Sequence, residues 1–364
     1  MQKDLSILFV PFGTERIAAT RYRVYQYLPY LMKHSIRFKV FSIISDKTTR
    51  EMINSSTFTG LRKITYYFKV VLEKIIRFLP ILILARKYKI LFLQRTTFPF
   101  GLERILKMMN ENIVFDLDDA IFIPDKKEYG LIGRMKEYSK EVEVANILRV
   151  SKLAIVENEY IKKYASKYCK DIFLIPGPID TKRNFVKKKS YKNNKVTIGW
   201  IGSPSTLNYL NMLDGVFKEL AKKFDVEIKV IGAGEYKLDG IKVTNINWSV
   251  ENEVEELQSF DIGVMPMPNN EWTRGKLGCK MLQYMAVGVP AVVSYTATNA
   301  EVISDGLNGF LINSEKECLE KLSLLIKDFS LREKIGKNGR RTVEEKFSLD
   351  VNAPKFRELL EKYF

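Results

Sequence analysis

Short apolar runs alternate with longer amphipathic segments along the whole chain, and this pattern predicts two series of β-strands separated by helices. In the first half the predicted strands are 6–12, 38–43, 89–94, 113–117, 153–157 and 172–175. In the second half they are 196–201, 226–231, 241–246, 261–265, 291–294 and 310–312. Alternation of this kind is typical of right-handed crossovers and of a mostly parallel sheet covered on both faces. The sequence therefore predicts an α/β protein with two doubly wound domains that face each other across a cleft.

Segments outside the strands indicate how the chain divides. Residues 182–195 (KRNFVKKKSYKNNK) are polar, very basic and without periodicity, as expected of a linker. At 364 residues, two domains of ordinary size are expected. The predicted division is a first domain at 1–181, the linker at 182–195, a second domain at 196–349 and a helix at 350–364. That last helix lies outside the second predicted sheet, so it is free to cross back to the first domain.

The amino-acid composition indicates which classes of partner the protein can bind. The chain is 46% hydrophobic, so it can bury large cores, and its formal net charge of +16 favours anionic partners. Nucleic acid is not expected, because no recognisable nucleic-acid motif accompanies the charge. The three cysteines, Cys169, Cys279 and Cys318, are far apart and form no CxxC pair. They predict reduced thiols in a cytoplasmic protein and no zinc site.

The remaining anionic partners are phosphate-bearing molecules and membranes. The N-terminus leads directly into a strand pattern, so no signal peptide is expected. The strongly apolar run at 78–85 is far shorter than the ~20 residues of a membrane-spanning helix. Residues 61–89 mix Lys and Arg with Tyr, Phe, Leu and Ile, which is typical of a helix lying on an anionic membrane surface. A helix packed on the sheet explains its apolar face equally well, but the surplus of basic and aromatic residues favours peripheral contact with the inner face of the cytoplasmic membrane.

The stretch 272–310 carries two polar loops at neighbouring strand ends, and each loop leads into a helix N-terminus. Ligands bind at that edge of an open α/β sheet. Lys276, Lys280 and Gln283 are spaced i, i+4 and i+7, so they share one face of the helix predicted from about Leu277 and ended by Gly288. Free N–H groups and lysines there would converge on a bound phosphate, although a solvated basic face explains this loop equally well on its own.

Three other motifs of the second half have both a functional and a structural interpretation. Gly202 and Ser203, in IGWIGSPST, allow a ligand to approach the backbone, but a strand–helix turn needs the same residues. Thr298 and Glu301 have the spacing of a capping box, which is compatible with a loop that presents N–H groups to a ligand. Gly232-Ala233-Gly234 lacks a third glycine, so a tight turn is favoured over a dinucleotide site.

The first half offers two candidates near strand ends. Asp118 and Asp119, in FDLDDAIF, could hold a proton, a sugar hydroxyl or a metal, or they could be turn and helix-cap acids. Arg21 and Arg23, at the start of the first predicted helix, could bind an anionic acceptor or carry solvated charge. The only histidine, His34, is expected in a surface turn and supports no catalytic triad.

The stretch KMLQYMAVGVPAVVSYTATNAEVISDGLNGF resembles the donor-site segment of GT-B glycosyltransferases of the family 4 type. IGWIGSPST, RYRVYQYLPYL and FDLDDAIF add to the resemblance, which spans nearly the whole chain. It implies two Rossmann-like domains, with a nucleotide-diphosphate-sugar donor mainly in the second and the acceptor mainly in the first. It also implies sugar transfer, usually with retention of anomeric configuration and without a metal. Many such proteins are peripheral membrane enzymes that build envelope glycolipids or polysaccharides.

The sequence departs from this family at the donor site. Two glutamates of the family pattern, eight positions apart, fall on Gly275 and Gln283. Gln283 can still donate or accept a hydrogen bond with a ribose hydroxyl, whereas Gly275 has no side chain that could reach the sugar. The basic pair of the family is absent from GSPSTLNYL. We expect Arg274, Lys276 and Lys280 to hold the diphosphate instead, because the leaving nucleotide gains negative charge in the transition state.

The expected function is therefore transfer of a sugar from a nucleotide-diphosphate sugar to a hydroxyl of a glycan or lipid-linked acceptor. The expected donor-binding residues are Gly202, Ser203, Arg274, Lys276, Lys280, Gln283, Asn299 and Glu301. Gly13, Arg21 and Arg23 are expected on the acceptor side, and Asp118, Asp119 and Lys276 in catalysis, with no metal and no other cofactor. Two alternatives stay open: a nucleotide-sugar epimerase or hydrolase of the same fold, and a basic binding protein without catalysis.

Overall fold

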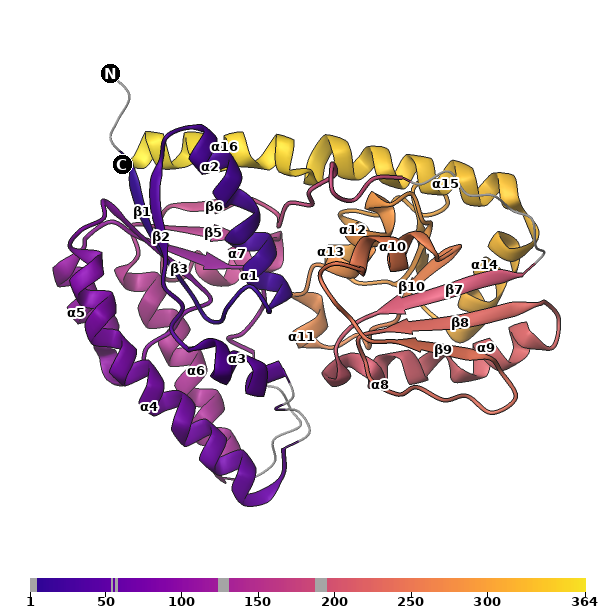
Figure 1. The fold of residues 1–364 in the computed structure, drawn as a ribbon, viewed down its shortest axis with the longest axis horizontal. Helices are drawn as coiled ribbons and strands as arrows, with labels where there is room; N and C mark the ends of the chain where they lie inside the picture. The colour runs from indigo at the N-terminus through magenta and orange to yellow at the C-terminus, as the bar shows by residue number, and fades with distance from the viewer. Residues whose placement is uncertain (1–4, 54, 56–57, 124–130, 187–194) are drawn as a thin grey trace. The chain divides into compact units, whose positions relative to one another are not determined.

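A computed structural model describes residues 5–53, 55, 58–123, 131–186 and 195–364, with 131–139 described by their backbone alone (Figure 1). The chain divides into two compact units, each built around one parallel sheet. The first unit contains Met1–Pro178, Gly275–Leu277 and Asn352–Phe364, and the second contains Ile179–Arg274 and Gly278–Val351. Most of the linker predicted at 182–195 lies outside the described residues.

The sheet of the first unit has six parallel strands in the order β2-β1-β3-β4-β5-β6. The strands are β1 (Ser6–Pro11), β2 (Arg37–Val40), β3 (Ile90–Gln94), β4 (Ile113–Leu117), β5 (Leu153–Val156) and β6 (Ile172–Leu174). All six predicted strands are confirmed, with ends shifted by up to three residues. The four inner strands are buried along their whole length, because helices cover both faces of the sheet.

The helices of the first unit pack on the two faces of this sheet. They are α1 (Ala18–Arg23), α2 (Leu28–Lys33), α3 (Asp46–Ile53), α4 (Gly60–Ala85), α5 (Leu102–Met109), α6 (Leu131–Val150) and α7 (Glu159–Ala165). In Figure 1, α2 lies on one face, and α4, α5 and α6 lie on the other. The helix predicted at 61–87 is confirmed as α4, the longest helix of the described chain.

The single helix predicted at 20–33 is wrong, because the structure breaks it into α1, the 3-10 helix η1 (Tyr25–Tyr27) and α2. Val24, at the end of α1, has φ −128° and ψ −66°, which is outside the helical region. Pro29, near the start of α2, has no N–H to donate to the carbonyl four residues earlier. The apolar periodicity survives this break, which is why the pattern alone predicts one helix.

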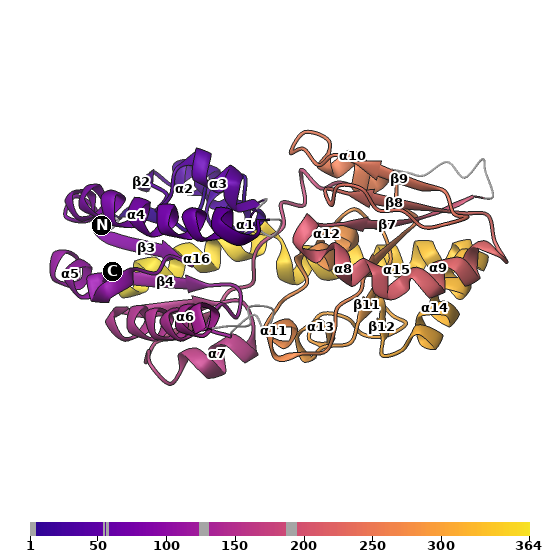
Figure 2. The same cartoon turned by 90° about the horizontal axis from the view of Figure 1, so that it is seen from below.

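The sheet of the second unit also has six parallel strands, in the order β12-β11-β10-β7-β8-β9. The strands are β7 (Val196–Ile201), β8 (Val226–Ile231), β9 (Val243–Ile246), β10 (Ile262–Met265), β11 (Ala291–Ser294) and β12 (Phe310–Ile312). Four of the six coincide with the predicted ranges, and β9 and β10 begin one or two residues later. Figure 2 shows the strands of each sheet lying side by side.

In the second unit, α15 packs against the end of α12 through two glycines, Gly288 and Gly336. The helices are α8 (Leu207–Leu210), α9 (Asp214–Ala221), α10 (Glu253–Gln258), α11 (Glu271–Arg274), α12 (Cys279–Ala286), α13 (Ala297–Ala300), α14 (Glu315–Lys327) and α15 (Phe329–Thr342). Gly288 follows α12 with φ +75°, as the prediction that glycine ends this helix requires. Gly336 in α15 packs directly on the Gly288 carbonyl, because an added Cβ would lie 2.1 Å from that oxygen.

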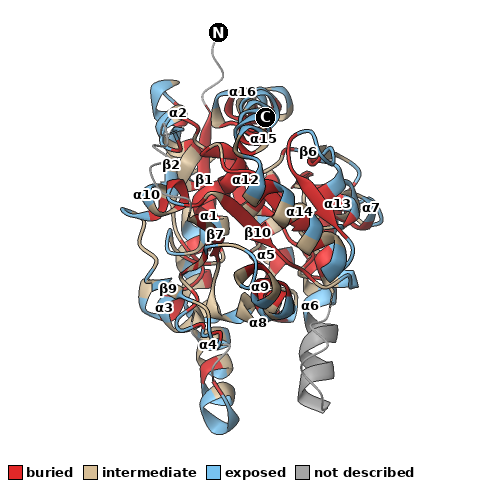
Figure 3. Ribbon diagram, turned by 90° about the vertical axis from the view of Figure 1, so that its right-hand side faces the viewer, coloured by how far each residue is buried: buried red, intermediate tan, exposed pale blue. Residues whose placement is uncertain are grey.

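The last helix, α16 (Leu349–Tyr363), follows the π-helical turn η6 (Val343–Phe347). Residues 352–364 group with the first unit. There the buried ring of Phe356 lies 4.6 Å from the Tyr27 ring and 5.6 Å from the Phe92 ring, measured between centroids. Figure 3 shows the central strands of both sheets largely as buried. Each unit therefore has its own apolar core.

The contact at Gly336 gives a test of the packing in the second unit. Gly336→Ala should lower the free energy of unfolding by about 1–3 kcal/mol, because a backbone carbonyl cannot move aside as a side chain can. Gly215→Ala in α9 is the matched control, since its Cβ would meet only the Glu315 carboxylate at 3.6 Å. The control should change stability by less than about 1 kcal/mol in urea denaturation. Equal stability of the two variants would contradict the packing of α15 described above.

Candidate functional site

Charged side chains gather at the carboxyl ends of the central strands of the first unit. Because β3, β4 and β5 are parallel neighbours, the residues that follow them meet at one edge of the sheet. The cluster consists of Arg23, Arg95, Asp116, Asp118, Asp119 and Glu157. Sequence analysis selected three of its members, whereas Arg95, Asp116 and Glu157 were not selected.

Arg23 and Asp116 form a buried ion pair, with exposed side-chain fractions of 2% and 1%. The Nε of Arg23 donates to Oδ2 of Asp116 at 3.0 Å, and its Nη1 donates to the Ile175 carbonyl at 2.6 Å. Burial raises the pKa of Asp116, and the two-pronged contact with Arg23 opposes that shift. Arg23, expected on the acceptor side, thus connects α1 to β4 and to the segment after β6.

Arg95 pairs with both of the aspartates that sequence analysis singled out. Its Nη2 donates to Oδ2 of Asp118 at 2.8 Å and lies 3.2 Å from Oδ2 of Asp119, and its Nε also contacts Asp118. Arg95 has φ +50°, a left-handed conformation that costs a non-glycine residue about 1–3 kcal/mol. This conformation directs the guanidinium of Arg95 to the carboxylates that follow β4. The sequence signal that could have selected Arg95 as a candidate is its position directly after β3.

Among the carboxylates at this edge of the sheet, Glu157 has the largest shift in pKa. Burial first, and then the nearby Asp118, raise its pKa from 4.5 to about 8. Its Oε1 accepts a hydrogen bond from the Gly177 N–H at 3.1 Å. The side chain keeps partial exposure, so this carboxyl group with a raised pKa lies within reach of solvent. A group of this kind can give or take a proton in a reaction.

The other two residues expected on the acceptor side lie near the end of β1. Gly13 is buried, and its carbonyl accepts a hydrogen bond from the Ser42 hydroxyl at 3.1 Å. The Nη1 of Arg21 donates to the Glu15 carbonyl at 3.2 Å. Both residues therefore help to hold the loop that follows β1, at the same edge as the charged cluster.

In the second unit, Lys280 lies beside the loop that follows β7. Its Nζ is 4.1 Å from the centroid of the Trp200 ring and donates to the Thr206 hydroxyl at 3.2 Å. Lys280 belongs to the first turn of α12, whose N-cap residue, Gly278, has no side chain that could cap the helix. A cation and a helix N-terminus thus occur together at the carboxyl ends of β7 and β10.

Gly202 and Ser203 complete this loop. A Cβ on Gly202 would lie 2.6 Å from the Lys280 Nζ and 2.3 Å from the Trp200 ring, so the position requires glycine. The Gly202 carbonyl in turn lies 2.7 Å from the place where Gly232, with φ +81°, would carry a Cβ. The hydroxyls of Ser203 and Ser205 are 2.8 Å apart. The loop presents backbone and hydroxyl groups beside an ammonium group, which suits an anion.

The remaining expected donor residues of the second unit have different surroundings. The Nε2 of Gln283, a buried side chain, donates to Glu253 Oε1 at 2.8 Å. Asn299 is buried and donates to the Ser294 carbonyl, and its Oδ1 accepts no hydrogen bond from the described residues. Glu301 is exposed at the end of α13. The capping box expected at Thr298 is wrong.

The residue that caps α13 is Thr296, whose side chain accepts from the Asn299 N–H at 3.1 Å. The buried Thr298 hydroxyl lies 3.0 Å from the Thr296 hydroxyl. The helix begins two residues earlier than the capping-box spacing predicts. Thr296, Thr298 and Asn299 are all of residue types found at caps, so composition could not separate them.

The basic loop before α12 is divided between the two units. Arg274 is exposed, and its Nε donates to Asn269 Oδ1 at 3.0 Å. Gly275 and Lys276 group with the first unit. A Cβ on Gly275 would lie 2.5 Å from the Ala120 Cβ, which gives a packing reason for glycine where the family pattern has a glutamate.

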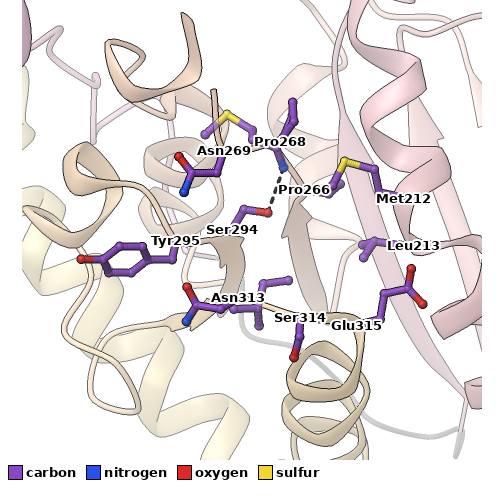
Figure 4. Close-up of a pocket in the computed structure, with 12 residues that line it drawn as sticks. Met212, Leu213, Pro266, Pro268, Asn269, Ser294, Tyr295, Asn313, Ser314 and Glu315 are labelled. Atoms are coloured by element: carbon purple, nitrogen blue, oxygen red, sulfur yellow. Dashed lines mark hydrogen bonds between the residues drawn. The ribbon is translucent and has the colours of Figure 1, made fainter. Parts of the chain in front are cut away.

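A cavity of about 420 Å³ opens at the carboxyl ends of β10, β11 and β12. Figure 4 shows its polar lining, in which the Ser294 hydroxyl accepts a hydrogen bond from the Met267 N–H at 2.9 Å. Asn269, Tyr295 and Asn313 also line it, from the loops that follow these strands. None of the expected donor-binding residues lines this cavity, although one of its loops continues into Asn299. In the described part of the chain, no group of three or more acidic, His or Cys side chains is arranged for a metal.

Sequence comparison places the second unit with a known type of domain. Residues 195–328 match the family described as "Glycosyl transferases group 1". The chain is 29% identical over 181 residues to the capsular polysaccharide biosynthesis glycosyltransferase CapM of Staphylococcus aureus, covering 46% of this chain and 47% of CapM. It is 27% identical over 132 residues to the uncharacterized glycosyltransferase MJ1069 of Methanocaldococcus jannaschii, covering 36% of this chain and 32% of that protein. The chain thus matches less than half the length of these curated relatives.

Solved structures match the whole fold. Anabaena Alr3699/HepE in complex with UDP-glucose has a TM-score of 0.69 at 15% identity, covering 98% of this chain and 100% of that one. Sucrose-phosphate synthase from Thermosynechococcus elongatus has a TM-score of 0.72 at 12% identity, covering 98% of both chains. The predicted α/β fold of two doubly wound domains is confirmed, and it is the GT-B fold. Residues 195–328 thus match a family of glycosyl transferases, and the solved structures match the fold.

The raised pKa of Glu157 predicts a pH dependence of stability. The folded chain keeps the Glu157 proton up to about pH 8, whereas an unfolded glutamate releases it near 4.5. Wild-type stability should therefore fall as the pH rises through this window. Glu157→Gln should weaken that fall and make the protein more stable than wild type at pH 8, measured by urea unfolding. Glu159→Gln, at an exposed neighbouring position, should leave the pH profile unchanged. A Glu157→Gln profile identical to that of wild type would show that the carboxyl group is not shifted.

Proposed function

We propose that the protein is a glycosyltransferase that moves a sugar from a nucleotide-diphosphate sugar to a hydroxyl group of a glycan or lipid-linked acceptor. The observation that carries the proposal is the arrangement in the second unit of Lys280, the Gly202–Ser203 loop and the N-terminus of α12. A diphosphate fits these groups, because they supply a cation, a helix N-terminus and close approach to the backbone. The Anabaena structure contains UDP-glucose, which supports a uridine nucleotide as the first donor to examine.

In the proposed reaction, the acceptor oxygen forms a bond to the anomeric carbon while the bond from that carbon to the diphosphate breaks. The leaving nucleoside diphosphate gains negative charge, and the ammonium group of Lys280 stabilises that charge. Arg274 and Lys276 are proposed to contribute further positive charge to the donor, and Gln283, Asn299 and Glu301 to contact the rest of it. Retention of anomeric configuration is part of the proposal and comes from the family resemblance alone.

The first unit is proposed to bind the acceptor at the edge that carries its charged cluster. Asp118 and Asp119 are proposed to contact the acceptor, and Gly13, Arg21 and Arg23 to shape its site. Glu157 joins this proposal as a group that exchanges a proton near neutral pH. The match to CapM supports an envelope polysaccharide or glycolipid as the acceptor class. We further place the enzyme on the inner face of the cytoplasmic membrane, where lipid-linked acceptors are found.

The proposed function is tested by measuring thermal unfolding with a panel of nucleoside diphosphates and nucleotide-sugars. A donor that binds should raise the unfolding temperature, because it binds only the folded chain. The donor that does so is then incubated with an acceptor, and the products are separated. Transfer to the acceptor supports the proposal, whereas release of free sugar or an epimerised donor indicates a hydrolase or an epimerase. Binding of no nucleotide would favour a protein without catalysis.

Two lysine variants test how the donor is held. Lys276→Ala and Lys280→Ala should each lower turnover by about 10²-fold, as expected when one group that stabilises the leaving charge is removed. Lys222→Ala is the control, because Lys222 is an exposed lysine paired with Glu219 at the end of α9. Circular dichroism and unfolding temperature show whether each variant keeps its fold. Unchanged turnover of both lysine variants would refute the proposed diphosphate contacts.

A further inference from the structure

Helix α4 carries an apolar face that no described part of the protein covers. Its exposed large side chains recur every three or four residues, so they form one stripe along the helix. They are Leu61, Ile64, Phe68, Val71, Leu72, Ile75, Ile76, Leu79 and Ile83. Exposed fractions of 75% for Leu61, 71% for Phe68 and 62% for Leu79 show that the stripe is open from one end to the other. At 1.5 Å per residue, it is about 33 Å long.

The opposite face of α4 accounts for its packing on the sheet. Phe78, Ile81 and Ala85 are buried there in the core of the first unit. Figure 3 shows the projecting end of α4 coloured largely as exposed or intermediate. Monomeric proteins rarely leave a continuous apolar surface of this length in water. Packing against its own sheet therefore explains one face of α4, and the other has no partner among the described residues.

The lysines and arginine in the middle of α4 turn toward the protein and not toward the stripe. Lys69 pairs with Glu51, and Lys74 donates to the Thr97 carbonyl. Arg77 donates to the Ser42 carbonyl. The exposed face itself is thus almost purely apolar, with Arg62 at one end and Arg86 and Lys87 at the other.

The charged residues around the stripe are mostly basic. Residues 58–110, which include α4 and α5, contain eleven Lys and Arg but only two acids, Glu73 and Glu103. Glu103 is buried, and Glu73 accepts a hydrogen bond from the Ser45 N–H. No carboxylate of α4 or α5 therefore lies on the exposed face. An apolar stripe with cationic ends fits a surface that offers both acyl chains and anionic headgroups.

A second copy of this chain fits the same face less well. In a two-fold dimer the helices would pair antiparallel or parallel, and each would bring its cationic ends against those of the other. Neither helix offers an exposed carboxylate to pair with them, so like charges would oppose the contact. Lipid phosphates would instead attract Arg62, Arg86 and Lys87.

We propose that the exposed face of α4 is a membrane-docking surface that lies in the interface of an anionic bilayer, with the stripe from Leu61 to Ile83 among the acyl chains. This inference deepens the membrane part of the proposed function and rests on it only for the location of the acceptor. No described helix is long and apolar enough to cross a bilayer. Because the apolar stripe runs along one side of α4, the proposed contact is one in which the helix lies parallel to the membrane plane.

The test is co-sedimentation of the full chain with vesicles of phosphatidylcholine alone or with about one-third phosphatidylglycerol, without any donor. Wild type should bind the anionic vesicles at least about tenfold more strongly than the neutral ones. The double variant Phe68→Glu/Leu79→Glu should weaken binding to anionic vesicles by at least about tenfold, because it places charge in the apolar stripe. Both positions are exposed, so the unfolding temperature should stay close to that of wild type.

Met32→Glu/Leu324→Glu is the matched control, since it adds the same charge at exposed apolar positions of α2 and α14. It should bind anionic vesicles nearly as well as wild type. Equal loss in the control would show that net charge alone governs binding and would overturn the proposal. The proposal would also be overturned if wild type bound no vesicles and sedimentation velocity showed a dimer that the Phe68→Glu/Leu79→Glu variant does not form.

Activity distinguishes failure of this inference from failure of the proposed function. Sugar transfer to a water-soluble acceptor is measured for the same proteins without vesicles. Transfer by wild type that binds no vesicles would overturn the docking surface alone. Vesicle binding that depends on the stripe, in a protein that transfers no sugar, would support the docking surface and refute the glycosyltransferase proposal alone.

Discussion

The constraint on which the molecule depends is that every strand pairing in both sheets is parallel. Parallel strands need a crossover between each pair, so helices cover both faces and bury the inner strands. The same geometry brings all carboxyl ends of a sheet to one edge. Polar residues that are distant in sequence, such as Arg95 and Glu157 or Gly202 and Lys280, meet only for this reason.

At the edge of the first sheet, burial would be costly for single charges. Arg23 and Asp116 are nearly inaccessible, and each is tolerated because the other neutralises it and hydrogen bonds satisfy the remaining donors. Arg95 adopts a left-handed backbone to reach the pair of aspartates after β4. At Glu157, burial and the nearby Asp118 outweigh the effect of Arg23 and Arg95, so the pKa is raised. Strain and a shifted pKa at one edge are typical of sites where chemistry takes place.

Helix α4 shows how one element can serve two environments. Its buried residues and inward-turned cations attach it to the first unit, and its exposed stripe has no covering in the described chain. Amphipathic periodicity usually separates a protein core from water. Here α4 has two apolar faces, one buried and one exposed, and its cations lie between these faces. Lys74 and Arg77 extend along the helix surface and donate to backbone carbonyls.

Local pattern determined the strands, the fold class and the glycine that ends α12, because burial on a sheet requires apolar runs of a definite length and period. The loop between Trp272 and Phe310, and the residues Gly202 and Lys280, could also be selected, since strand ends are legible in the sequence. Only the tertiary structure decided which charges pair. Arg95 and Glu157 carry no distinctive motif, and Arg23 proved to be bound to Asp116 across 93 positions of the chain. Spacing also failed where similar residues competed: Thr296, not Thr298, caps α13, and Val24 with Pro29 breaks a helix whose periodicity continues unchanged. Period is a property of neighbours in sequence, whereas hydrogen-bond partners and the burial of charge depend on residues that only folding brings together.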